Sequence, residues 1–530
     1  MPTSLLVGLC LLGAPPAAAA PASGPAGRLS GPLAEAVGAT PEALQLRMPR
    51  FVAGAQVVVE LDHPLDPAAL TELGATVEVD LPEQMQLRLP VAALPRLAAL
   101  PGVRHVREPA RARAAAVQSE GHEAVGTTAW TTAGWRGAGV EVAVVDVGFS
   151  GWEELVPDEL PADTRAALQF GAPESSRHGN AVAEVISDVA PMASLTLHSF
   201  STDTEFVEVM TSLLDSDVQV VNASIGFDNA WNLDGTSAPS RAVDALADAG
   251  VVVTVAAGNE AQRYRIGELR AVGDGQVLLG GLAATPVPAP LGRARVSFRW
   301  NEPFDRAAVD LDLVVKNADD FEECGRSGAP QDGDDRPVES VDVSGCSEEV
   351  LVFLQAGPEV DPAGLTGWLY SPNGFAEGVA TLGLSLSTPG DAAGALTVGA
   401  WISETDELAS YSSRGPTEDG RIKPDVVGPS DVSTVSWGER VFRGSSAATP
   451  HAAGLAALWI EAEGGDAEEF RAWVREAAVD RGEEGPDTTW GWGVLDAGSG
   501  PPGACACASG HGTGFGSLAL LLAALYRRRS

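Results

Sequence analysis

The chain has 530 residues, of which 45% are hydrophobic and 20% charged, and its formal net charge is −38. This length corresponds to about three or four domains, and the high hydrophobic fraction excludes a disordered acidic chain. Because phosphate binding requires clustered lysine and arginine, so large an excess of acids argues against nucleic acid as a partner and favours a role in solubility.

The first residues have the pattern of an export signal. A short apolar core, SLLVGLCLLG, precedes the small residues of APPAAAAPAS, where cleavage near Ala20 is expected. The positively charged start of such signals is missing apart from the α-amine, so a plain alanine- and proline-rich tail is the alternative. We therefore expect a signal peptide over 1–20, a low-complexity linker over 21–54, and an exported protein located outside the cell or on a bacterial surface.

Residues 55–109 have the pattern of a small α+β module. Strand-type segments are AQVVVEL, ATVEVDL, MQLRLP and VRHVREP, and helical segments are DPAALTELG and VAALPRLAALPG. Their order, β-α-β-β-α-β, is that of the ferredoxin-like split motif. The polar stretch that follows, over 110–119, is expected to be an exposed and cleavable linker.

From residue 120 onward, continuous apolar runs alternate with helical spacing. The runs GVEVAVVD, SLTLHSF, VQVVNASIGF and GVVVTVAAGN are typical of strands covered on both faces. The alternation predicts an α/β fold, a parallel sheet with helices on both faces, over 120–262 and again over 386–498. Between them, over 263–385, short β-type segments separated by Gly, Pro and Asp predict an inserted all-β sandwich or jelly roll.

The cysteines and the tail support the export hypothesis. Cys324 and Cys346 are separated by a polar loop, and in an exported protein they are a disulfide candidate worth about 3 kcal/mol. The tail over 499–530 joins GACACASGHG to a short apolar segment, FGSLALLLAALY, and to RRRS. It resembles bacterial C-terminal sorting tags, and membrane contact is expected through this tail alone. The apolar segment is short of the roughly 20 residues of a bilayer span, so a buried helix is the alternative.

Four polar residues stand where apolar strands end or helices begin. Asp146 closes GVEVAVVD, His178 opens a helical stretch, Asn259 ends VVVTVAAGN, and Ser446 begins the helix that contains TPHAAGLAALW. Acyl transfer from a peptide needs a nucleophile, a base, an acid that orients the base, and a donor for the oxyanion, and these residue types supply all four. Taken singly, each has a plain structural reading: a loop acid, a structural histidine, a turn residue and a helix cap.

The local chemistry fits these roles. A histidine at a helix N-terminus is disfavoured as a cation, so we expect His178 to be neutral, as a base must be. Pro450 is tolerated only near a first turn, which places the helix start near Ser446. His451 lies five residues further on, about 140° around the helix from Ser446, and is therefore expected to face elsewhere.

Together these stretches resemble the subtilisin-like serine proteases, the subtilases. The family's aspartate motif matches VVDVGF, its histidine motif HGNAVAE, its oxyanion motif AAGN and its serine motif GSSAATPH, and SSRGPTEDGRIKPDVVGP resembles the stretch before the serine. The resemblance covers about 120–262 and 386–498. It implies that Ser446 is the nucleophile, His178 the base, Asp146 its orienting acid and Asn259 an oxyanion donor.

The resemblance also implies a substrate pocket and a zymogen. Two segments would form the pocket walls, one of Ser224, Ile225 and Gly226 and the other of Ala256, Ala257 and Gly258. The module over 55–109 resembles the family's propeptides, which act as intramolecular inhibitors and chaperones. The expected partners are therefore polypeptide substrates and the chain's own propeptide, with no cofactor and no metal.

Three residues depart from the family pattern. Val147 follows the aspartate in place of a small hydroxyl residue, Asn180 stands for threonine after His-Gly, and Ser445 for threonine before the nucleophile. These changes and the large insert motivate an alternative, a catalytically degenerate subtilase that binds partners at the cell surface. The insert is otherwise a spacer. The presence of all the triad atoms favours a serine endopeptidase.

Overall fold

The computed structural model describes residues 29, 33, 36–37, 39–40, 54–80, 84–107, 118–170, 176–304, 306–328, 330–331, 333, 336–357, 360–498 and 500. The chain divides into two compact units, Met1–Ala114 and Ala115–Ser530. The expected signal peptide, most of the linker over 110–119, and the tail from 501 lie outside the described residues. Across the ranges described, no helix combines the length and the apolar character needed to cross a membrane.

The first unit contains an antiparallel sheet with the strand order β2-β3-β1-β4. Its elements are β1 (Ala55–Leu61), α3 (Pro67–Glu72), β2 (Thr76–Asp80), β3 (Gln84–Leu89), α4 (Leu94–Ala98) and β4 (Val103–Arg107). Asp66 caps α3 by accepting a hydrogen bond from the N–H of Ala68. Leu70 of α3 and Leu97 of α4 share one hydrophobic cluster with Val57 and Leu87 of the sheet. This is the ferredoxin-like arrangement that the sequence predicts.

The second unit is built around a mainly parallel sheet with the order β20-β19-β9-β8-β5-β7-β6, in which β21 also pairs with β19. Its strands are β5 (Glu141–Asp146), β6 (Arg165–Gln169), β7 (Ser194–Ser199), β8 (Val220–Ala223), β9 (Val252–Ala256), β19 (Leu396–Ile402), β20 (Glu407–Leu408) and β21 (Val426–Pro429). The pairings are parallel except between β19 and the short β20.

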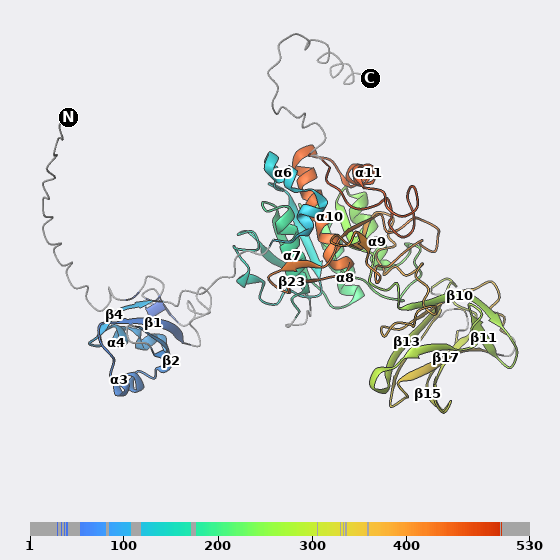
Figure 1. Ribbon diagram of the computed structural model, residues 1–530, viewed down its shortest axis with the longest axis horizontal. Helices are drawn as coiled ribbons and strands as arrows, with labels where there is room; N and C mark the ends of the chain where they lie inside the picture. Colours follow the sequence, from blue (N-terminus) through green and yellow to red (C-terminus); the bar gives the residue numbers. More distant parts are fainter. Residues whose placement is uncertain are drawn as a thin grey trace, which may run out of the picture. The chain divides into compact units, whose positions relative to one another are not determined.

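Helices cover both faces of this sheet, as the alternating pattern predicts (Figure 1). They are α5 (Gly121–Val125), α6 (Thr128–Ala133), α7 (His178–Val189), α8 (Asp203–Leu213), α9 (Ala238–Asp248), α10 (Ser445–Glu463) and α11 (Ala467–Ala477). Val142 and Val144 of β5 belong to the hydrophobic cluster that contains α7 and α10, whereas Ala143 and Val145 belong to the cluster with α8 and α9. Because side chains alternate along a strand, Asp146 falls on the same face as Val142 and Val144, the face that α7 covers.

An antiparallel β region is inserted between β9 and β19. Its strands are β10 (Tyr264–Ala271), β11 (Gln276–Leu279), β12 (Thr285–Pro288), β13 (Arg293–Trp300), β14 (Leu311–Asn317), β15 (Glu323–Ser327), β16 (Val338–Ser344), β17 (Glu349–Ala356) and β18 (Thr366–Tyr370). Eight of them follow the order β15-β14-β17-β11-β10-β18-β13-β16, and β12 pairs with β17 beside this path. Residues from both halves of the path pack in one core, as in a sandwich. The expected disulfide between Cys324 and Cys346 is present, with 5.9 Å between the two Cα atoms.

Buried polar contacts fix the insert to the segment that follows β8. Arg299 of β13 is 1% exposed and donates to Asn232 Oδ1 of that segment at 3.0 Å. It also forms an ion pair of 2.8 Å with Glu418, in the stretch before β21, and lies 4.2 Å from the ring centre of Trp368 within the insert. Asn229 donates to the carbonyl oxygen of Ser297 at 3.2 Å. The insert therefore contacts the chain close to the carboxyl end of β8, where polar residues of the expected site gather.

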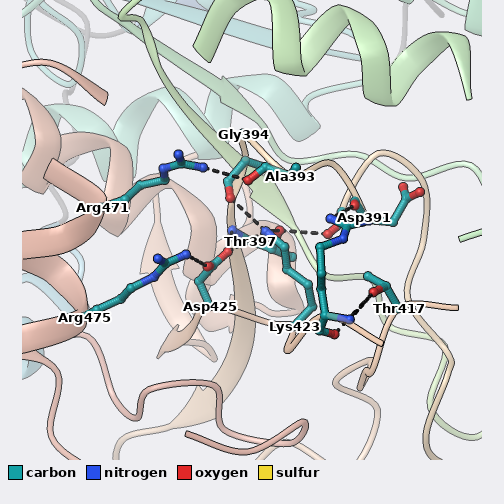
Figure 2. Close-up of polar contacts among 12 residues, drawn as sticks. Asp391, Ala393, Gly394, Thr397, Thr417, Lys423, Asp425, Arg471 and Arg475 are labelled. Atoms are coloured by element: carbon teal, nitrogen blue, oxygen red, sulfur yellow. Dashed lines mark hydrogen bonds and ion pairs between the residues drawn. The ribbon is translucent and has the colours of Figure 1, made fainter. Parts of the chain in front are cut away.

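A buried lysine organises the region before β21 (Figure 2). Lys423 Nζ donates to the carbonyl oxygen of Ala395 at 2.8 Å, to Thr397 Oγ1 at 2.9 Å and to Asp425 Oδ2 at 2.6 Å. Arg475 of α11 donates to the other carboxylate oxygen of Asp425 at 2.8 Å. Burial lowers the pKa of Lys423, whereas Lys423 and Arg475 outweigh burial and hold the pKa of Asp425 below its usual value.

We expect Asp425→Asn to lower the free energy of unfolding by about 3–5 kcal/mol, because the change leaves the ammonium of Lys423 buried without its counter-charge. Urea unfolding followed by tryptophan fluorescence measures the change. Asp419→Asn is the matched control: its partner Arg421 forms a surface ion pair of 2.7 Å with side chains 42% and 29% exposed, so a change within about 1 kcal/mol is expected. Equal destabilisation by the two variants would contradict the role given to the buried pair.

Candidate active site

Asp146 and His178 are joined across the sheet–helix interface. His178 is the first residue of α7, and its Nδ1 lies 2.8 Å from Asp146 Oδ1 and 2.9 Å from Oδ2. A carboxylate only accepts hydrogen bonds, so Nδ1 carries the proton and the lone pair of neutral His178 is on Nε2. The carboxylate of Asp146 is fully buried, whereas the side chain of His178 is 22% exposed. The pair can therefore orient an imidazole whose free nitrogen acts as a base.

The pKa of His178 shifts in the direction opposite to the one expected from its place at a helix start. Burial alone would lower its pKa, but the charge of Asp146 and the hydrogen bond to it raise the pKa above the usual value. The helix dipole, which suggested a neutral histidine, is thus outweighed by a counter-charge in direct contact. His178 gains its proton more readily than an isolated histidine.

Ser446 is the second residue of the long helix α10 and lines a cavity together with His178. Its Oγ donates to the carbonyl oxygen of Ser224 at 3.0 Å, and Ser224 Oγ donates to the carbonyl oxygen of Ser446, also at 3.0 Å. Gly444 precedes the helix at φ 113°, and a Cβ atom there would lie 3.1 Å from Asn259 Nδ2. Glycine is therefore needed both for the backbone angle and for the approach to Asn259.

Asn259 has its amide held in one orientation. Its Oδ1 accepts from the backbone N–H of Ser445 at 2.8 Å and from Ser445 Oγ at 3.2 Å. Since a backbone N–H can only donate, the oxygen faces Ser445 and Nδ2 is the group left to donate to a substrate oxygen. Ser445 Oγ also accepts from the N–H of Gly258 at 3.1 Å. Ser445 thus holds the Asn259 side chain, which explains how a serine can replace the family's threonine here.

The remaining departures lie next to the triad. Asn180 donates through Nδ2 to the carbonyl oxygen of Ser150 at 2.8 Å, which ties the start of α7 to the loop after β5. Val147 lines the cavity beside His178. Neither change removes an atom of Asp146, His178 or Ser446.

A cavity of about 260 Å³ opens at these residues. Its lining includes His178, Asn259 and Ser446 together with five of the six expected wall residues: Ser224, Ile225, Gly226, Ala256 and Gly258. Ala257 differs from the expectation, because its side chain is buried against Leu233 and Leu386. Alternate residues of an extended segment point to opposite sides, so Ala257 faces away from the cavity that Ala256 and Gly258 line.

His451 faces away from the cavity, as its helical spacing predicts. Its Nε2 lies 3.1 Å from Ser119 Oγ, and its Nδ1 lies 2.9 Å from the carbonyl oxygen of Ala447. Burial lowers the pKa of His451 to about 4. It is a neutral core residue of α10.

The sequence analysis missed the hairpin that covers His178. The hairpin joins β22 (Val432–Thr434) to β23 (Gly438–Phe442), with Trp437 in its turn and Phe442 at the end of β23. The ring centres of Trp437 and Phe442 lie 6.2 and 5.6 Å from that of His178. Glu184 of α7 accepts from the N–H groups of Val435 and Ser436, at 2.5 and 3.2 Å, and thereby holds the hairpin turn. Burial raises the pKa of Glu184, against these hydrogen bonds. The signal in the sequence that could have indicated this hairpin is Glu184, an acid within the apolar run AVAEVI of α7.

The fold of the second unit is that of the subtilisin-like proteases. Residues 377–493 match the model of the subtilase family, Peptidase S8. The chain is also similar to the structure of the CspB protease of Clostridium perfringens, with 17% identity, a TM-score of 0.51, and coverage of 72% of this chain and 98% of that one. A cold-adapted subtilisin-like serine proteinase matches at 15% identity and a TM-score of 0.37, covering 68% of this chain and 90% of that one.

Proposed function

We propose that the protein is an exported serine endopeptidase, made as a zymogen, in which Ser446, His178 and Asp146 form the catalytic triad. The observation that carries the proposal is the paired hydrogen bonding of His178 Nδ1 to both oxygens of Asp146, beside the cavity that Ser446 and Asn259 line. This arrangement supplies the base, the orienting acid, the nucleophile and the oxyanion donor at one place.

The first chemical step uses Ser446 and His178. Ser446 Oγ exchanges its acceptor, the Ser224 carbonyl, for His178 Nε2 and attacks the carbonyl carbon of the substrate. His178 takes the serine proton and returns it to the leaving amine, and the buried charge of Asp146 stabilises the imidazolium between these transfers. Water then hydrolyses the acyl-enzyme by the reverse sequence.

The oxyanion is held by two donors. Asn259 Nδ2 is one, because its amide orientation is set by Ser445. The N–H of Ser446 is the other, since amides in the first turn of a helix have no intrahelical acceptor and stand at the positive end of the helix dipole. Such donors lower the barrier because they are already oriented where negative charge develops.

The first unit, with its ferredoxin-like sheet, would serve as the inhibitory propeptide, and the linker over 110–119 would be cut on maturation. The apolar start of the sequence and the tail would direct export and surface attachment. These roles follow from the family resemblance and from the sequence pattern.

A fluorophosphonate probe tests the proposal. The probe reacts only with a serine whose proton is removed by an adjacent base, so the matured protein should be labelled, and mass spectrometry should place the label on Ser446. Labelling should weaken at low pH, as His178 becomes protonated. Correctly matured protein that stays unlabelled would favour the degenerate, partner-binding alternative.

A further inference from the structure

The lining of the cavity includes two acids that the sequence analysis did not assign to the site. Asp228 follows the first wall segment and Glu260 follows Asn259, and both line the cavity that opens on His178 and Ser446. Ser387 lies between the walls: a Cβ atom on Gly226 would come within 2.5 Å of its Cβ, and one on Gly258 within 2.4 Å of its Oγ. The two acids and Ser387 therefore line the same cavity as Ser446, and Ser387 lies beside a glycine of each wall.

Asp228 is held by hydroxyl groups. Its Oδ1 accepts from Ser387 Oγ at 2.6 Å, and its Oδ2 accepts from Tyr370 Oη at 3.2 Å. A carboxylate offers about four acceptor positions, so two hydroxyl donors orient the group and leave positions for a donor from a ligand. Tyr370 belongs to β18, so the inserted β region supplies one of the two groups that orient Asp228.

Glu260 is paired with Arg263. Arg263 Nη1 donates to its two carboxylate oxygens at 3.0 and 3.1 Å. Burial and the charge of Asp228 raise the pKa of Glu260 to about 7, against the opposing effect of Arg263. Burial likewise raises the pKa of Asp228, against its two hydroxyl bonds and Arg263. When both acids are ionised, Asp228, Glu260 and Arg263 together carry a net charge of −1. A cation on a ligand would stabilise this buried negative charge.

We propose that this cavity receives the side chain of the substrate residue whose carbonyl is attacked, and that Asp228 selects a basic side chain there, arginine or lysine. The inference rests on the proposed function, because it takes Ser446 as the nucleophile. The walls at Ile225 and Ala256 contact the aliphatic part of such a side chain, and the charged end reaches Asp228. Arginine fits best, because its planar guanidinium presents several donors to a carboxylate.

The insert thereby gains a role in specificity. Tyr370 orients Asp228, and Arg263 at the start of the insert pairs with Glu260. Two hydrogen bonds, from Arg299 to Asn232 and from Asn229 to Ser297, fix the insert to the segment that carries Asp228. Removing the charge of Asp228 should therefore change which residue is accepted while leaving the triad intact.

The test compares kcat/KM on peptides that differ only at the residue before the cleaved bond, which is arginine, its uncharged and similarly shaped analogue citrulline, or leucine. Wild-type protein should favour arginine over citrulline by about 100-fold. Asp228→Asn should lower kcat/KM for the arginine peptide by about 100-fold and leave that for the leucine peptide within a few-fold. Asp215→Asn, which changes an exposed acid in the turn after α8, is the matched control and should keep the wild-type preference.

Fluorophosphonate labelling separates this inference from the proposed function. Asp228→Asn protein should still be labelled at Ser446, which shows that it is folded and that its triad works. Wild-type protein that is labelled but cleaves citrulline and arginine peptides equally would overturn the inference and leave the proposed function standing. Failure of both labelling and cleavage would overturn the proposed function itself.

A second measurement needs no variant. Benzamidine carries a planar cation, so it should slow fluorophosphonate labelling of wild-type protein, whereas uncharged benzamide at the same concentration should not. Equal effects of the two compounds would contradict a cation-selecting pocket.

Discussion

Ser446→Ala is expected to lower kcat for peptide hydrolysis by about 10⁶-fold. The reason is that Ser446 Oγ is the atom proposed to form the acyl-enzyme, and alanine has no atom to replace it. Removing the nucleophile alone costs nearly as much as removing the whole triad, because the base and its orienting acid then have nothing to activate. The rate is measured by release of a chromophore from a peptide substrate by purified, matured protein.

The same variant tests the zymogen. If the chain cuts its own linker, Ser446→Ala protein should accumulate as an uncut precursor, seen as a larger band and an unprocessed N-terminus by mass spectrometry. Ser410→Ala, at an exposed turn position, is the matched control and should mature normally. Unchanged hydrolysis by matured Ser446→Ala protein would contradict the mechanism. Normal cleavage of the linker in that variant would show that another protease performs the maturation.

Much of the catalytic fold could be predicted because its strands are buried on both faces. Runs such as VEVAVVD are almost continuously apolar, which is typical of strands covered on both faces. Strands β5, β7, β8 and β9 all fall within the segments predicted from such runs. Because side chains alternate along β5, Asp146 lies on the face of the sheet that α7 covers, and α7 begins at His178. Residues at the carboxyl ends of neighbouring parallel strands meet at one edge, so the positions of Asp146 and His178 follow from local patterns.

The pocket acids could not be predicted because their meaning depends on distant partners. Asp228 becomes a pocket residue only through Ser387 and Tyr370, which lie 159 and 142 positions further along the chain. Glu260 is paired with Arg263, three residues away, yet its place in the cavity depends on the fold of the walls. In the sequence both look like acids in ordinary turns.

The hairpin over His178 was missed for a similar reason. Strands β22 and β23 are short, and the acid that holds their turn, Glu184, is on another element. The pKa of His178 was also misjudged, because the sequence shows a helix start but not the distance to a counter-charge. The charge of Asp146, 2.8 Å from His178 Nδ1, affects the pKa of His178 more than the helix dipole does. That distance is known only from the folded chain.

Asp146→Asn is the second substitution with a large expected effect, a fall in kcat of about 10⁴-fold. An asparagine places an N–H₂ group opposite His178 Nδ1, so Nδ1 must accept and the imidazole proton moves to Nε2. The nitrogen that faces the nucleophile then has no lone pair to take the serine proton. The loss of the buried negative charge also removes the stabilisation of the imidazolium.

The pH profile gives a readout that a merely structural effect would not produce. In the wild-type protein Asp146 raises the pKa of His178 above its usual value, and the base must be neutral, so kcat/KM should rise with pH through a midpoint above that of an ordinary histidine. In Asp146→Asn protein burial remains and the raising charge is gone, so the midpoint of the residual activity should move to lower pH. A variant that loses activity with an unmoved midpoint would show that Asp146 acts on the fold alone and not on the proton affinity of His178.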